Sequence, residues 1–371
     1  MSAVPSYFTD FLSDIRLTPE LRDACEAKHR ELRERLGADP DLKAIVIDAF
    51  LQGSYRRHTG VRILADGEHI DVDLVVVTTL DPNSWTPAAV VARFKPFLDG
   101  NYKDHWSVND RSMKIWFDDT PVTLDLVVTA APSEVIQEAI AKAAATEWRI
   151  EARGDVNGGP VALREAIEGL RKMAGDAQWK QERLLIPDRT LKIWVPTHPL
   201  EQIRWTEEKN DLTDSHYVNI VKSGKWWRKR NAVPEYPKGY PLEHLLGHVC
   251  PNDIGSVAEG LTRSFERIRD DYRYAVSTGT VASLPDHGVP ENDVFRRVTP
   301  EDFAAFWHLV DRAAGDARAA LDADTVAESV TRWRALLGPE FPEPPKDGGF
   351  TERVAKSTVV TTGRYGLGHR R

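Results

Sequence analysis

The sequence predicts an α+β fold, in which a half built from a sheet and helices precedes a mostly helical half. Two runs rich in β-branched residues, at 69–80 and 122–130, are typical of buried strands. After Pro132 such runs give way to long segments with apolar residues at helical spacing. The chain has 371 residues, of which 41% are hydrophobic, so it can bury a sizeable core in two lobes.

The first half is expected to begin with a helix from about Thr18 to Ala49, because Pro19 suits a helix start and the apolar residues recur at helical spacing. This pattern breaks at Gly53-Ser54, and Asp66-Gly67 predicts a hairpin turn. The remaining expected elements follow in order along the chain: a strand within 69–80, a helix within 85–100, and two or three strands within 105–130 with a turn at 118–121.

The second half is expected to hold helices within 213–231, 240–250, 253–276 and 300–321. We predict a first lobe over residues 1–195, which includes the N-terminal helix, and a helical lobe over 196–340. Residues 341–371 are rich in proline, glycine and charge, which predicts a flexible tail.

Composition argues against a nucleic-acid-gripping, disulfide-rich, secreted or membrane-spanning protein. The net charge of −8 disfavours a protein whose main task is to grip long nucleic acid by its phosphates. The two cysteines, Cys25 and Cys250, provide neither a disulfide framework nor metal-thiolate spacing. The N-terminus lacks the features of a signal peptide, and no apolar run reaches the ~18 residues of a membrane helix. We therefore expect a soluble, cytoplasmic protein that needs no membrane.

Three aspartates form the first candidate site. Asp71 and Asp73 stand two residues apart at the start of a strand, so both carboxylates face the same side of the sheet. Asp125 lies in the second Val-rich run, and if the two strands are neighbours, three carboxylates converge. Such a cluster is costly unless cations compensate it, and Mg²⁺ prefers carboxylate and phosphate oxygens. The alternative is a solvated strand end, with Asp125 paired to an arginine.

Two metal ions held about 3.5–4 Å apart can clamp the attacking and leaving oxygens of an in-line displacement at phosphorus. One ion would lower the pKa of an attacking ribose hydroxyl, and the other would neutralise charge on a leaving pyrophosphate. The three aspartates therefore predict a site for two Mg²⁺ ions, for which Mn²⁺ can substitute.

Gly53-Ser54 supplies a second candidate site, for phosphate. Glycine allows the backbone to approach a phosphate closely, and a helix start presents free N–H groups to an anion. Ser54 adds a hydroxyl donor. A helix N-cap is the alternative role for this serine, and the two roles are compatible.

The order Gly53-Ser54, then Asp71-Val72-Asp73, then Asp125 on a later strand resembles the nucleotidyltransferase superfamily of DNA polymerase β. In the second half, HYVNIVKSGKWWRKRN and YPKGYPLEHLLGHV are similar to the oligoadenylate synthetase and cGAS branch. They resemble still more its bacterial relatives, the CD-NTases of CBASS anti-phage defence. HPLEQIRWTEEKN and LPDHGV resemble the D clade of those enzymes, and the similarity extends from about residue 6 to about 342.

The resemblance implies a polymerase-β-like catalytic lobe and an oligoadenylate-synthetase-like helical lobe. It implies that the three aspartates bind metal, that Gly53 and Ser54 bind the triphosphate, and that Lys225 holds the donor triphosphate. It also implies that Tyr240 stacks on a nucleobase, although a tyrosine there is otherwise a packing residue.

The residues themselves add a basic stripe. At helical spacing, Lys222, Lys225 and Lys229 share one face, which is either a solvated surface or a wall for phosphates. Arg56 and Arg57 are further candidate phosphate neighbours.

The family implies a cyclic oligonucleotide synthase that makes a second messenger, a cyclic trinucleotide from ATP with or without GTP. Alternatives are a nucleotidyltransferase that modifies a protein or a tRNA, and an inactive scaffold that acts through its tail. Some members bind HORMA-type regulators with a TRIP13-like ATPase, whereas others are joined to a target by ubiquitin-like conjugation machinery. The final residue, Arg371, disfavours conjugation, for which we expect a small residue. The acids do not determine the bases, ring size or linkage of the product.

Overall fold

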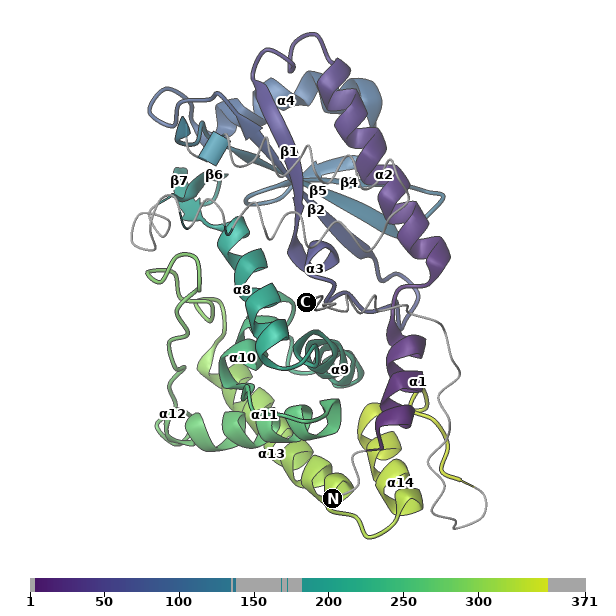
Figure 1. Ribbon diagram of the computed structural model, residues 1–371. Coiled ribbons are helices and arrows are strands. Elements are labelled where there is room, and N and C mark those ends of the chain that lie inside the picture. Colours follow the sequence, from purple (N-terminus) through teal and green to yellow (C-terminus); the bar gives the residue numbers. More distant parts are fainter. Residues whose placement is uncertain (1–3, 135, 138–167, 169–171, 173–181, 346–371) are drawn as a thin grey trace, which may run out of the picture.

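The computed structural model describes residues 4–134, 136–137, 168, 172 and 182–345. A sheet-containing half lies above a helical half in Figure 1. This arrangement confirms the predicted α+β class. The strands are β1 (Val46–Gln52), β2 (Ile70–Thr78), β3 (Trp106–Val108), β4 (Met113–Trp116), β5 (Val122–Thr129), β6 (Leu184–Asp188) and β7 (Ile193–Thr197).

The main sheet has the strand order β1-β2-β5-β4-β3, and β6 and β7 form a separate pair. β2 and β5 run parallel, whereas β1 and β4 flank them in antiparallel orientation. The helix expected up to Ala49 is therefore wrong beyond α2 (Pro19–Ala38), because residues 46–52 form β1. A short apolar run suits a strand or a buried helix equally, and pairing with β2 decides between them.

The hairpin expected at Asp66-Gly67 is present only as a turn. Gly67 has a φ of 85° there, but the residues before it form no strand. β1 reaches β2 instead through the short helix α3 (Gly53–Arg56) and the following loop. The Asp66-Gly67 turn therefore lies outside the paired residues of β1 and β2, and α3 directly follows β1.

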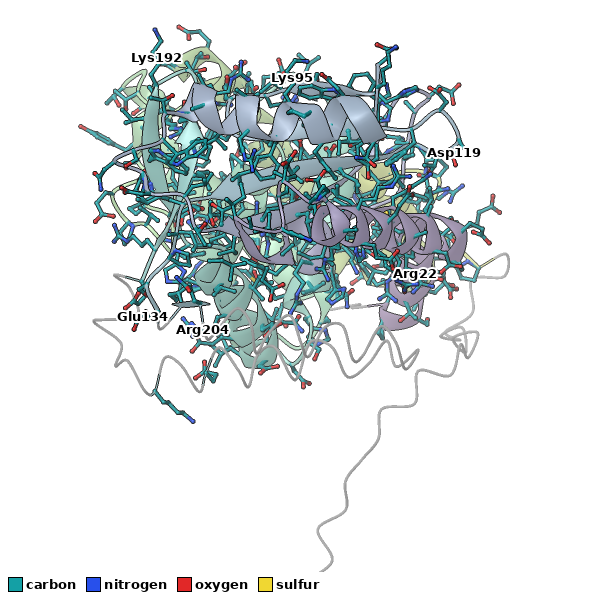
Figure 2. The ribbon with its side chains drawn as sticks, turned by 90° about the horizontal axis from the view of Figure 1, so that it is seen from above. Arg22, Lys95, Asp119, Glu134, Lys192 and Arg204 are labelled. Atoms are coloured by element: carbon teal, nitrogen blue, oxygen red, sulfur yellow. The ribbon has the colours of Figure 1, made fainter. Side chains whose placement is uncertain are left out.

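The two faces of the sheet pack against different helices. Val72, Leu74 and Val76 of β2 share a buried cluster with residues of α2 and of α4 (Pro87–Asn101). Val75 and Val77 instead pack with residues of α8 (Pro199–Leu212). Because side chains alternate along a strand, odd-numbered residues of β2 face away from α2 and α4. Seen from above, α4 carries Lys95 on its outer side (Figure 2).

The helices predicted in the second half are present, except that the one expected within 253–276 is divided into two, and a final helix, Val326–Leu337, was not predicted. The elements of this half are α9 (Tyr217–Arg230), α10 (Tyr240–Val249), α11 (Val257–Asp271), α12 (Arg273–Ser277), α13 (Pro300–Leu321) and α14 (Val326–Leu337). α1 (Pro5–Ile15) packs in the same apolar core as these helices, although it begins the chain. The boundary expected near residue 195 stays a prediction, and the two cores do not divide strictly along the sequence.

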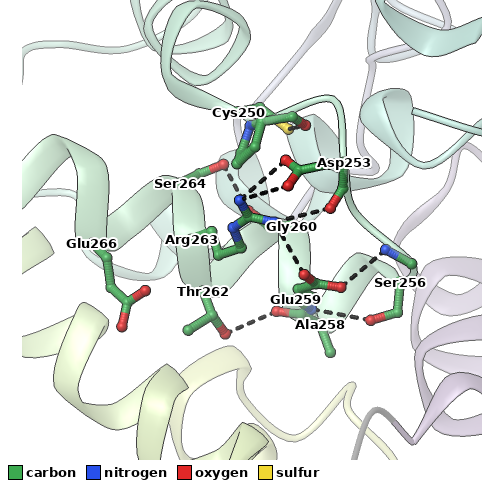
Figure 3. A network of polar contacts seen from close by, with 12 residues as sticks. Cys250, Asp253, Ser256, Ala258, Glu259, Gly260, Thr262, Arg263, Ser264 and Glu266 are labelled. Atoms are coloured by element: carbon green, nitrogen blue, oxygen red, sulfur yellow. Dashed lines mark hydrogen bonds and ion pairs between the residues drawn. The ribbon is translucent and has the colours of Figure 1, made fainter. Parts of the chain in front are cut away.

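α11 begins at a capping arrangement formed by a Ser-x-x-Glu segment. Ser256 Oγ accepts a hydrogen bond from the Glu259 amide at 3.1 Å, and Glu259 accepts one from the Gly255 amide at 2.9 Å. Arg263 then donates to both Glu259 and Asp253 (Figure 3). These contacts satisfy free amides at the helix start and fix the loop before α11.

The expected tail at 341–371 falls mostly outside the described residues, which end at 345. Within the described residues, none of the helices combines the length and the apolar character that crossing a bilayer requires.

Candidate functional site

The three predicted aspartates lie on two neighbouring parallel strands. Asp73 of β2 is the direct register partner of Asp125 of β5, and Asp71 is the partner of Thr123. All three carboxylates belong to the odd-numbered face, which α2 and α4 do not cover. The condition set by the sequence, that the two strands be neighbours, is therefore met.

Asp73 is the least compensated of the three acids. Burial and the neighbouring Asp125 raise its pKa from 3.8 to about 6, and Asp71 adds to this, while Arg57 and Lys114 act in the opposite direction. Within the described part of the chain, the Asp73 carboxylate receives no hydrogen bond. A partly buried carboxylate beside other carboxylates favours a proton or a cation.

The turn between β3 and β4 holds Asp125. Ser112 Oγ donates to Asp125 Oδ1 at 2.9 Å, and Asn109 Nδ2 donates to the same oxygen at 3.3 Å. Burial raises the pKa of Asp125, although Lys114 and the two hydrogen bonds lower it. Both donors meet one oxygen, so the turn sets the rotation of this carboxylate.

Asp71 is the most exposed of the acids and pairs with a lysine. Lys114 Nζ donates to Asp71 Oδ1 at 2.7 Å, and Thr123 Oγ1 donates to the same oxygen. Lys114 is the register partner of Asp125 on β4. Burial disfavours its charge, but the hydrogen bond to Asp71 and the nearby carboxylates raise its pKa overall.

This donor set fits a hard cation only in part as it stands. Within the described residues, no three carboxylate, imidazole or thiolate groups converge closely enough to hold a metal ion. Asp71 is turned to Lys114 and Thr123, whereas Asp73 and Asp125 lie side by side as register partners. The oxygen donors and the uncompensated charge at Asp73 are the chemistry that Mg²⁺ or Mn²⁺ prefers.

Gly53 brings the chain against Asp73. Its φ is 72°, and a Cβ placed there would lie 1.8 Å from Asp73 Oδ2. Glycine is therefore required twice, once for the backbone conformation and once for the close approach. Ser54 is the second residue of α3 rather than its N-cap, which is Gln52. The predicted phosphate turn and the acids thus meet at one place.

A buried ion cluster ties this turn to the helical half. Glu243 of α10 accepts hydrogen bonds from Arg57 Nε at 2.7 Å, Thr59 Oγ1 at 2.7 Å and Lys225 Nζ at 2.6 Å. Burial raises the pKa of Glu243, but Arg57 and Lys225 outweigh it and hold that pKa far below its usual range. Lys225, predicted to hold a triphosphate, is therefore fixed beside the phosphate turn.

The rest of the basic stripe separates. Lys222 is buried, and burial, Arg16 and Lys225 lower its pKa to about 7. Lys229 instead pairs with Glu68 of the Asp66-Gly67 turn, at 2.5 Å. The stripe is therefore not one continuous wall for phosphates, and only Lys222 and Lys225 remain candidates.

Arg56 and Tyr240 lie near the site in different ways. Arg56 is buried and pairs with Glu207 of α8 at 3.5 Å, whereas Arg57 is the arginine close enough to lower the pKa of Asp73. Tyr240 donates from its hydroxyl to Asp286 at 2.7 Å, and the Arg57 guanidinium lies 5.3 Å from its ring centre. Base stacking by Tyr240 stays a prediction.

Sequence reasoning missed several residues of this site. Lys114, Ser112 and Asn109 reach the acids only through the pairing of β4 with β5. A lysine within the apolar strand Met113–Trp116 was the one available signal. Glu243 follows Tyr240 by three residues, but nothing local pointed to Arg57 and Thr59, which lie 186 and 184 residues earlier.

Comparison with known proteins supplies further evidence. The family described as Second Messenger Oligonucleotide or Dinucleotide Synthetase domain matches residues 1–150. The chain is 38% identical over 379 residues to a protein of Enterobacter hormaechei named cyclic AMP-AMP-GMP synthase, covering 96% of this chain and 98% of the relative. A protein of an Acinetobacter species, named cyclic AMP-AMP-AMP synthase, is 28% identical and covers 90% of this chain and 84% of its own length.

Solved structures show the same fold at low identity. The cyclic AMP-GMP synthase DncV of Vibrio cholerae has a TM-score of 0.64 at 11% identity, covering 91% of this chain and 96% of its own. CdnC of E. coli MS115-1, solved in complex with HORMA-deltaN, has a TM-score of 0.60 at 16% identity, covering 92% of this chain and 99% of its own.

Proposed function

The chain belongs to the cGAS/DncV-like nucleotidyltransferases, the CD-NTases, whose members make cyclic oligonucleotides, and we propose that it makes a cyclic trinucleotide second messenger from ATP and GTP in anti-phage defence. One observation carries this proposal. The cyclic AMP-AMP-GMP synthase matches nearly the whole chain, including both lobes that would shape a nucleotide site.

Each nucleotidyl transfer has a simple balance. The ribose hydroxyl oxygen of one nucleotide forms a bond to the α-phosphorus of another and loses its proton. The bond from that phosphorus to the bridging oxygen breaks, and pyrophosphate leaves with the electron pair. Three such transfers, the last within one molecule, close a cyclic trinucleotide and release three pyrophosphates.

Asp71, Asp73 and Asp125 are the residues that we propose to hold two Mg²⁺ ions. When bound, these ions would neutralise phosphate charge and lower the pKa of the attacking hydroxyl. The chain's own contribution is to orient the acids: β2 and β5 place Asp73 beside Asp125, and Ser112 sets the rotation of the Asp125 carboxylate. To bind a metal ion through the same oxygen, the exposed Asp71 would have to give up its present contact with Lys114.

The phosphate turn and two lysines support triphosphate binding beside these acids. Gly53 permits close backbone approach, and Ser54 Oγ makes no hydrogen bond within the described residues. The charged groups that act on Lys222 are Arg16 and Lys225, both cationic. A buried ammonium among cations is costly, and a triphosphate would compensate it. Lys225 would contribute the one N–H donor of its ammonium that Glu243 and Thr59 leave free.

Nucleobase contacts and partners complete the proposal. Tyr240 is proposed to stack on a base, with its hydroxyl fixed by Asp286. The complex of CdnC with HORMA-deltaN supports testing a HORMA-type regulator and a TRIP13-like ATPase as partners. Capture of the C-terminal residue by ubiquitin-like machinery is the competing route, and it would appear as a covalent adduct.

The decisive experiment is a product assay. The protein is incubated with radiolabelled ATP and GTP and with Mg²⁺ or Mn²⁺, with and without a HORMA protein, and phosphatase-resistant products are identified by mass spectrometry. We expect a cyclic trinucleotide, and none from the double variant Asp71→Ala/Asp73→Ala. Product from that variant would refute the metal assignment. A labelled protein or tRNA without a small product would favour macromolecule modification, and no ATP–Mg²⁺ thermal stabilisation would favour the idle scaffold.

A further inference from the structure

We propose that Lys114 is an internal counter-cation that occupies Asp71 in the metal-free site and opposes binding of a divalent cation there. The inference rests on the proposed function, because it assumes that Asp71 is a metal ligand.

The strand registers bring Lys114 into the row of acids. Asp73, Asp125 and Lys114 are consecutive register partners across β2, β5 and β4, so their side chains rise from one face of the sheet. Asp71 stands two residues before Asp73 on the same face. Lys114 therefore extends diagonally across β5 to Asp71 and places its ammonium 2.7 Å from Oδ1.

Charge explains why the lysine takes this position. The Lys114 ammonium contacts Asp71, and its strand position pairs with that of Asp125, which itself pairs with Asp73. Its positive charge therefore lies on the same sheet face as the carboxylates of Asp73 and Asp125. Three carboxylates on one sheet face repel each other, so a fixed ammonium among them stabilises the metal-free fold.

The same contact places Lys114 in competition with a metal. The Asp71 oxygen that Lys114 contacts also accepts a hydrogen bond from Thr123, so a cation that uses this oxygen must replace at least one donor. A cation on the other oxygen of Asp71 would still lie close to the ammonium, and like charges at that range repel strongly. Nucleotide phosphates would shift the balance, because they add negative charge that attracts both cations. We therefore expect weak metal binding to the free protein and tighter binding together with nucleotide.

The test measures Mn²⁺ affinity of the free protein by isothermal titration calorimetry and by electron paramagnetic resonance. Lys114→Met removes the charge and keeps much of the volume, and we expect Mn²⁺ to bind about ten-fold more tightly. Lys114→Arg keeps the charge and should stay within about two-fold of the wild type. The matched control is Lys95→Met, which breaks the exposed Lys95–Asp99 pair on α4 and should leave the affinity unchanged.

Stability provides a second readout. Without metal, Lys114→Met should melt at a lower temperature than the wild type, and Mn²⁺ should raise its melting temperature more than it raises that of the wild type. If Lys114→Met does not fold, Lys114→Gln is measured in its place. An unchanged or weaker Mn²⁺ affinity in a folded neutral variant would overturn the role of Lys114.

The controls separate this inference from the proposed function. If the wild type binds Mn²⁺, Asp73→Asn loses that binding and Lys114→Met does not change it, then the metal site stands and only the proposed role of Lys114 is refuted. No Mn²⁺ binding by the wild type or by any Lys114 variant, with or without nucleotide, would overturn the proposed metal site as well.

Discussion

Replacing Gly53 by alanine is the sharpest probe of the site's geometry. Gly53 has a φ of 72°, and an alanine Cβ would lie 1.8 Å from Asp73 Oδ2 and 2.7 Å from its Cγ. The backbone conformation alone costs an ordinary residue about 1–2 kcal/mol. Relief of the clash requires Asp73 to rotate away, which adds about 0.5–1.5 kcal/mol if the side chain leaves its preferred rotamer. The unfolding free energy should therefore fall by about 1.5–3.5 kcal/mol.

Gly53→Ala should also slow catalysis. Displacement of a reacting group by about 1 Å costs on the order of 100-fold in rate, so we expect a loss of at least that size in pyrophosphate release. Gly67→Ala is the matched control, because Gly67 also has a positive φ, of 85°, but a Cβ there meets nothing within 4 Å. It should show the backbone cost without the loss of rate.

The assay combines urea denaturation with the initial rate of pyrophosphate release at saturating nucleotide and Mg²⁺. A Gly53→Ala protein that keeps its rate, while Gly67→Ala loses only stability, would refute the reasoning. Asp73 would then not lie against this turn, or its position would not matter to the chemistry.

Three further variants test other parts of the site. Ser112→Ala removes the closer donor to Asp125 and should raise the Mg²⁺ concentration needed for half-maximal rate about ten-fold, with the fold unchanged by circular dichroism. Glu243→Gln leaves Lys225 with an unbalanced buried charge and should cost about 3 kcal/mol of stability and raise the KM for ATP; an unchanged KM would show that Glu243 does not position Lys225. Asp73→Asn, measured in EDTA, should stabilise the protein by up to about 3 kcal/mol at pH 8, since the pKa of Asp73 is raised from 3.8 to about 6. That gain should fade as the pH is lowered through 6 towards 4 and should vanish only below 3.8, where the wild-type carboxyl is protonated in both states. A gain at pH 4 as large as that at pH 8 would exclude this cause.

The sequence alone determined those features that depend on local spacing. A period of two put Asp71 and Asp73 on one face, and two Val-rich runs identified the strands that carry the acids. Helical spacing located α9, α10 and α13. These patterns are local, so they can be read without knowing which strands pair or which helices meet.

Tertiary structure decided what local spacing leaves open. The segment at 46–52 became a strand because β2 offers it hydrogen-bond partners, and α1 joined the helical core far along the chain. The pairing of β4 with β5 brought Lys114 and Ser112 to the acids. Strand pairing and buried ion pairs join residues that are far apart in sequence. The energy of such a contact depends on both partners, so no local pattern encodes it. The three acids were therefore evident from the sequence, whereas the groups that compensate and orient them appeared only in the fold.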